Sequence, residues 1–205
     1  MFQPARNSAA DRYAPDGPYA FARLALSLAL ATLVGAGMWA VIVVLPEAQA
    51  EFGVDRAAAS LPYMLMMFGL AFGTIVLGRM ADRAGIWIPL ILAAAAQGLG
   101  FVAAGYAPNL PVFSAAHVLI GVGTGTGFGP MMADVSHWFL KRRGLAVVTV
   151  AAGNYLAGTI WPLLMSSSMP LVGWRATYAG IGLVIAATVT PLAFLMRRRP
   201  SAIFG

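Results

Sequence analysis

Six apolar segments, each about 20 residues long and free of Asp, Glu, Lys and Arg, make up most of the sequence. At roughly 1.5 Å of rise per residue, a helix of that length crosses a hydrocarbon core of about 30 Å. A soluble domain is excluded, because only 10% of the residues are charged, whereas about a quarter is usual. Transmembrane helices are therefore predicted at 24–45, 57–77, 86–106, 111–132, 145–165 and 177–196.

The predicted fold is all-α, a membrane protein built as one six-helix bundle. The connections are short, so consecutive helices are expected to be antiparallel neighbours. Pro46 is expected to end the first helix and Asp55 to cap the second, while Asn109 and Pro111 turn the chain into the fourth. The expected division is a disordered cytoplasmic tail at 1–23, the transmembrane domain at 24–196 and a basic cytoplasmic tail at 197–205.

Lys and Arg are distributed unevenly between the two sets of connections. Eleven of the thirteen lie at the two ends of the chain and in the second and fourth connections. Only Arg56 and Arg175 lie in the other set. Because cytoplasmic loops carry the excess of positive charge, both termini are predicted to be cytoplasmic. The chain is expected to be multi-pass in the plasma membrane, which in a bacterium is the inner membrane.

The net charge of +6 raises the question of nucleic acid binding. The basic residues, however, form short groups beside the apolar segments, where they set topology and lie near lipid headgroups. Nucleic acid is therefore excluded as a partner, and the lipid bilayer is the expected surrounding. The chain has no cysteine, which excludes thiol catalysis and cysteine-ligated metals. No metal site and no cofactor are expected.

Glycine occupies every second position in part of the fourth segment. On a helix, Gly121, Gly125 and Gly129 form one stripe, and Gly123 and Gly127 form another nearly opposite. Small residues at this spacing let helix backbones approach closely in lipid. We expect this helix to be packed on both sides, and the alternative is a glycine-lined substrate path. Prolines in or near the ends of five segments indicate either static kinks or bending.

The connection between the second and third segments carries a recognisable peptide. By itself, the stretch from Gly78 to Gly85 predicts a short cytoplasmic turn with an acid between two arginines. In this place it resembles the signature loop of the major facilitator superfamily, Gly-x-Leu-Ala-Asp-Arg-x-Gly, although a following basic pair is replaced by Ile86 and Trp87. The resemblance implies a gating loop, whose residues here are Gly78, Asp82, Arg83 and Gly85.

Two further stretches extend this resemblance over the chain. His117-x-x-x-Gly121-x-Gly123 is similar to the family's fourth-helix pattern, with histidine in place of the usual arginine. The stretches 138–146 and 173–178 resemble the monocarboxylate and oxalate-formate branch, and 16–21 is loosely similar to its acidic-Gly-aromatic motif. All matches correspond to the family's N-terminal six-helix half. The resemblance therefore implies a second six-helix half as partner, either a missing C-terminal half or another copy of this chain.

His117 is the only ionisable residue well inside a segment. Such a histidine is a candidate for a proton relay or a ligand, or it is neutral and hydrogen-bonded between helices. Several neutral polar residues would either line a substrate or proton pathway with it or bond across helices. They are Thr32, Trp39, Thr124, Asn154 and Tyr155.

Asp134 lies at the cytoplasmic end of the fourth segment, close to the basic group at 141–143. It is predicted to form a gate ion pair with Arg142, and Arg83 is the other candidate partner. The alternative is an ordinary interfacial cap.

The predicted function is secondary active transport of a small organic solute by alternating access, with a monocarboxylate as the candidate. An ion gradient would drive it, because no nucleotide-binding loop is present. The alternative is a non-transporting membrane module that packs against a partner half. An enzyme is not expected: Ser136 and His137 would point about 100° apart on a helix, and neither Gly-x-Ser-x-Gly nor His-Glu-x-x-His occurs.

Overall fold

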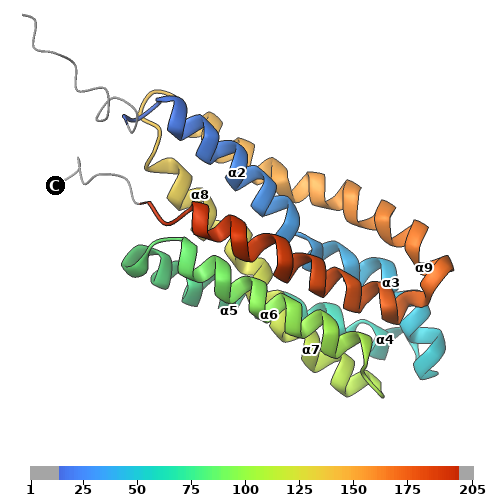
Figure 1. The fold of residues 1–205 in the computed structure, drawn as a ribbon. Coiled ribbons are helices and arrows are strands. Elements are labelled where there is room, and N and C mark those ends of the chain that lie inside the picture. Colours follow the sequence, from blue (N-terminus) through green and yellow to red (C-terminus); the bar gives the residue numbers. More distant parts are fainter. Residues whose placement is uncertain (1–13, 199–205) are drawn as a thin grey trace, which may run out of the picture.

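The computed structural model describes residues 14–198, and that part of the chain is helical without strands. Figure 1 shows an elongated bundle in which α2 begins and α9 ends at the same end. We call this the terminal end and the opposite one the far end. The elements are α2 (Pro18–Val34), α3 (Ala36–Phe52), α4 (Arg56–Ala59), α5 (Leu61–Ala84), α6 (Trp87–Gly105), α7 (Leu110–Thr124), the 3-10 turn η1 (Gly125–Gly127), α8 (Gly129–Ser136) and α9 (Arg143–Leu195).

The six predicted crossings are confirmed. Five helical stretches of the described part are long and apolar enough to cross a membrane, and the last, α9, has 53 residues. It reverses direction at Gly173, where φ is 80° and ψ is 160°, so it crosses twice (Figure 1). Glycine adopts this backbone conformation easily because it has no Cβ. The order of crossings is α2 with α3, α4 with α5, α6, α7 to α8, and the two halves of α9.

Some predicted boundaries need correction. α2 begins at Pro18, so 18–23 of the predicted disordered tail is helical. The remainder of that prediction at 1–13, like 199–205 of the basic tail, lies outside the described residues. Pro46 does not end the first helix, because α3 continues to Phe52. A proline removes only one backbone bond, and membrane helices tolerate this where neighbours or water satisfy the freed carbonyl.

The predicted helix starts are confirmed at two capping residues. Asp55 is the N-cap of α4 and its Oδ1 accepts from the Ala58 backbone N–H at 2.7 Å. Asn109 is the N-cap of α7 and its Oδ1 accepts from the Val112 backbone N–H at 3.0 Å. Each cap satisfies a backbone donor that a helix leaves unpaired in its first turn.

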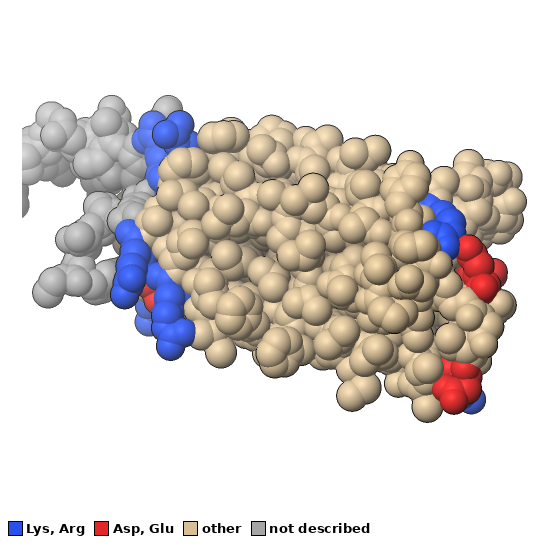
Figure 2. Space-filling model, turned by 90° about the horizontal axis from the view of Figure 1, so that it is seen from below, with Lys and Arg blue, Asp and Glu red and all other residues tan. Residues whose placement is uncertain are grey.

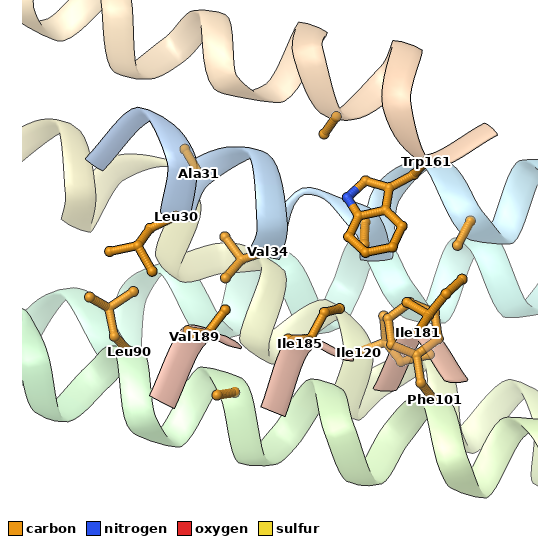
Figure 3. Packing of buried hydrophobic residues seen from close by; sticks show 14 of the residues in the cluster. Leu30, Ala31, Val34, Leu90, Phe101, Ile120, Trp161, Ile181, Ile185 and Val189 are labelled. Atoms are coloured by element: carbon orange, nitrogen blue, oxygen red, sulfur yellow. The ribbon is translucent and has the colours of Figure 1, made fainter. Parts of the chain in front are cut away.

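The core lies between the first, third, fourth, fifth and sixth crossings. Figure 3 shows Leu30 and Val34 of α2 facing the core side chains of α6, α7 and the second half of α9. Outside the core the surface is apolar too: on the face seen in Figure 2, charged residues lie at the two ends of the bundle and none lies on the long middle. This distribution fits a bundle surrounded by lipid.

Glycines set the closest helix contacts. A Cβ added at Gly121 would collide with backbone atoms of Met66 in α5, and one added at Gly69 of α5 would collide with the Val118 carbonyl in α7. Gly123 presses against α6 at Ala93. The remaining contacts of the glycine-rich stretch are Gly125 with Leu70 and Thr74, Gly129 with Thr74, and Gly127 with Val34. The fourth crossing is therefore packed against α5 on one side and against α6 and α2 on the other.

Candidate functional site

Arg23 forms the centre of a buried polar cluster at the terminal end. Its Nε and Nη2 donate to the two carboxylate oxygens of Asp134 in α8 at 3.0 and 2.9 Å. Its Nη1 also donates to the backbone carbonyl of Arg198 at 3.1 Å, and both Nη atoms reach the carbonyl of Met196 at 3.4 Å. The side chains of Arg23 and Asp134 are 2% and 12% exposed. One guanidinium thus joins the first, fourth and sixth crossings.

The segment before Arg23 closes over the connection between α8 and α9. The Asp16 Oδ2 accepts from the backbone N–H groups of Leu140 and Lys141, both at 3.1 Å. The backbone N–H of Asp16 donates to the carbonyl of Trp138 at 3.0 Å. The indole of Trp138 lies between Tyr19, at 5.0 Å between ring centres, and the Arg23 guanidinium, at 4.9 Å. The bonds from the Lys141 and Leu140 amides hold the pKa of Asp16 below its usual range.

The predicted gate pair is therefore wrong in its partner. Asp134 pairs with Arg23, and no ion pair joins it to Arg142 in the part of the chain that the structure describes. Arg142 is exposed in the connection before α9, where its backbone, like that of Lys141, faces Asp16. The charge distribution in the sequence predicts only that Arg23 helps to orient the chain. The two partners lie 111 residues apart, so no local pattern links them.

The stretch predicted as a cytoplasmic turn is mostly helical. Gly78, Asp82 and Arg83 lie in the last turns of α5, and Gly85, with φ of 83°, ends that helix. Asp82 and Gly85 line a hollow of about 410 Å³ between α5 and α8. The other residues around the hollow are Ala81, Pro130, Ala133, Asp134 and His137. The structure thus brings Asp82 and Asp134 to one hollow at the terminal end.

A second arginine cluster fastens the far end. Arg175 approaches the carboxylate of Glu51 with Nη2 at 2.7 Å and Nε at 2.9 Å. Its Nη1 donates to the carbonyls of Gly105 and Ala107 at 2.9 and 2.8 Å. The Trp174 Nε1 donates to Glu51 Oε2 at 2.6 Å. This cluster joins the end of the first crossing to the end of the third and the start of the sixth.

Both the first and the fourth crossings are interrupted, and the interruptions touch. The first is divided at Gly35 and the fourth at η1, and Gly127 packs against Val34. Gln97 of α6 bridges them: its Nε2 donates to the carbonyl of Val34 at 2.6 Å and to the Thr124 hydroxyl at 2.7 Å. Gln97 and Thr124 are fully buried. Thr124 therefore braces helices inside the bundle and reaches no solvent-exposed surface.

The other predicted pathway residues are separated by the fold. Thr32, Trp39 and Asn154 are half-buried in the seam between the first and fifth crossings. Tyr155 points outward and is 74% exposed. His117 is fully buried, with its Nδ1 2.8 Å from the Phe113 carbonyl and its Nε2 3.2 Å from the Tyr178 hydroxyl. These five residues and Thr124 do not line one continuous surface.

Comparisons with known proteins agree with this architecture. A family profile described as Major Facilitator Superfamily matches residues 27–203. The chain is 32% identical to the uncharacterized MFS-type transporter YcxA of Bacillus subtilis over 165 residues, which is 77% of this chain and 39% of that protein. It is 29% identical to the oxalate:formate antiporter of Oxalobacter formigenes, covering 72% of this chain and 35% of that protein.

The chain is also similar to a human transporter. The chain is 29% identical to monocarboxylate transporter 6 of Homo sapiens, with 82% of this chain and 33% of that protein covered. In all three comparisons the match spans between a third and two fifths of the relative's length.

Proposed function

Because the chain belongs to the Major Facilitator Superfamily, we propose that it forms one six-helix lobe of a secondary transporter that moves a small organic carboxylate by alternating access. It is an integral membrane protein and not an enzyme, as its helices and its transporter relatives indicate. The partner of the lobe is a second six-helix half, supplied by further sequence or by another copy.

This proposal rests on one observation: a cluster built around an arginine joins several crossings of the lobe to one another at each of its two ends. Alternating access in such folds requires each lobe to move largely as a rigid body. Arg23 ties the first crossing to the fourth and sixth at the terminal end. Arg175 ties the first to the third and sixth at the far end. Two buried or half-buried charge clusters on shared helices support rigid-body motion of the whole lobe.

The carboxylate class is supported by the relatives. One is named as an antiporter of oxalate and formate, and another as a monocarboxylate transporter. Oxalate, formate and monocarboxylates all carry a carboxylate group, so a carboxylate is the common chemistry. The exposed Tyr155 and the half-buried Trp39, Thr32 and Asn154 are proposed to face the solute, whereas the buried His117 and Thr124 act by holding helices together.

The terminal end is proposed to face the cytoplasm. Figure 2 shows Lys and Arg gathered there, as the positive-inside rule requires of a cytoplasmic face. The hollow lined by Asp82 and Asp134 would then be the inner gate, with Arg83 next to Asp82 in α5 and with Gly78 and Gly85 bounding the gating segment. In this proposal Asp82 holds the closed gate by accepting hydrogen bonds from the partner half, while Asp134 stays occupied by Arg23.

Uptake of labelled carboxylates tests the proposal. The protein is expressed from its natural reading frame, and inverted and right-side-out vesicles are loaded with formate, oxalate or lactate under an imposed pH gradient. We expect saturable flux of at least one carboxylate and its loss on Asp82→Asn at unchanged membrane abundance. Absence of flux for all three, with the protein present and folded, would instead support a non-transporting membrane module.

A further inference from the structure

A second hollow lies at the far end, away from the proposed gate, and it is larger than the hollow beside Asp82. It has a volume of about 620 Å³ and lies between α3 on one side and α4 with the start of α5 on the other. Pockets that hold small molecules measure about 300 to 1,000 Å³. We call it the far-end hollow. The residues that line it are Ile42, Leu45, Pro46, Gln49, Arg56, Ala59, Ser60 and Tyr63.

The lining divides into an apolar wall and a set of hydrogen-bond donors. Gln49, Arg56 and Tyr63 each carry a side-chain donor, and none of these side chains makes a hydrogen bond or ion pair within residues 14–198. The Ser60 hydroxyl is already used, because it donates to the Ala57 carbonyl at 2.6 Å. No carboxylate lines the hollow. The unpaired guanidinium of Arg56, in a lining without a carboxylate, favours an anion.

Arg56 differs from the other cation of the far end. Arg175 is occupied by Glu51 and by two backbone carbonyls. Arg56 follows Asp55, whose carboxylate caps α4 by accepting from the Ala58 N–H. Its guanidinium therefore remains available at the edge of the hollow, next to a wall that can hold a hydrocarbon group.

We infer that the far-end hollow binds small organic carboxylates, with Arg56 pairing the carboxylate and the apolar wall taking the carbon skeleton. The inference rests on the proposed function for its ligand class. The site would hold a solute at the outer face before or after it passes between the lobes. Glu47 and Asp55 are next to lining residues in the sequence and oppose an anion, so the pairing by Arg56 must outweigh them.

Fluorine NMR on the purified protein tests this inference without measuring transport. The probe is 4-fluorobenzoate, and 4-fluorobenzyl alcohol is the matched neutral compound of similar shape. We expect the acid to bind about tenfold more tightly than the alcohol, and Arg56→Gln to remove that difference, because a hydrogen bond to a charged group is worth about that factor. Lys141→Gln, which removes an equal charge at the terminal end, should leave binding unchanged.

Three results would overturn the inference: equal binding of acid and alcohol, unchanged binding in Arg56→Gln, or no binding by the protein expressed from its natural reading frame. The last would show that another segment fills the hollow. Failure of the transport proposal is separate, because loss of flux with selective, Arg56-dependent binding leaves the site in place.

Discussion

Trp39 and Trp161 each donate a hydrogen bond to the backbone across the seam between the first and fifth crossings. The Trp39 Nε1 donates to the Asn154 carbonyl of α9, and the Trp161 Nε1 donates to the Thr32 carbonyl of α2, both at 3.0 Å. The Trp39 ring also lies directly over Gly158. Each indole therefore satisfies its one donor on the backbone of the opposite crossing, and the two bonds join α9 to both α2 and α3.

Replacing either indole by phenyl should weaken this seam. Trp39→Phe and Trp161→Phe each lose one hydrogen bond, and we expect each to lower the free energy of unfolding by about 1 kcal/mol. Thermal unfolding followed by circular dichroism in detergent measures the change. Trp87→Phe is the control, because its indole N–H has no partner within residues 14–198 and its ring contacts with Phe194 and Arg197 suit phenyl as well. Equal losses in all three variants would contradict the prediction.

Arg23→Gln should be strongly destabilising. It leaves the carboxylate of Asp134 unpaired in a site where that side chain is 12% exposed, and breaking such a pair costs about 3 kcal/mol. Arg142→Gln, at the partner that sequence reasoning favoured, should be close to neutral. The double variant Arg23→Met with Asp134→Leu should recover most of the loss, since no charge remains buried. If Arg142→Gln were the more damaging single change, the ion pair assigned to Arg23 would be wrong.

Gly121→Ala should disrupt the contact between α5 and α7. The added methyl group meets the backbone of Met66 and Leu70, which cannot rotate away, and overpacking of this kind costs about 1 to 3 kcal/mol. Gly180→Ala adds the same methyl group where nothing lies within 4 Å. Unfolding in mixed detergent micelles should therefore separate the two variants. A comparable loss of stability in both would show that the contact of Gly121 with α5 is not the cause.

The contact of Asp16 with the connection between α8 and α9 should depend on pH. Bonds from the Lys141 and Leu140 amides lower the pKa of Asp16 in the folded state. The contact therefore contributes fully above the unfolded pKa of about 3.9 and is lost as the pH falls through the lower, folded value. The amide resonances of Leu140 and Lys141 should shift with a midpoint below 3.9. Asp16→Asn should abolish that titration, and a midpoint above the ordinary value would contradict the assignment.

The membrane-spanning helices could be predicted from sequence because uncharged runs and capping residues are local signals. Asp55 and Asn109 cap helices where the pattern placed them. The continuation of α3 through Pro46 could not be predicted in this way, since it depends on which groups satisfy the freed carbonyl. Gln97 stands alone in an apolar segment, and its polarity was the only available signal that a bridging side chain was needed there.

The candidate site is harder to predict from the sequence than the helices are, because its residues come together only in the folded protein. The Arg23 side chain reaches an aspartate 111 residues away and carbonyls at the end of α9. The Arg175 side chain binds a glutamate 124 residues away. The distribution of Lys and Arg along the sequence indicates only that both arginines help to set the topology. No residue near either arginine in the sequence indicates which carboxylate it pairs with.

The two arginine clusters act on the same pair of crossings, the first and the sixth, at opposite ends. A tilt of either crossing against the other therefore strains the hydrogen bonds of Arg23 at one end and of Arg175 at the other. The first and sixth crossings are thereby coupled along the whole length of the bundle, from the Asp134 side to the side of the far-end hollow.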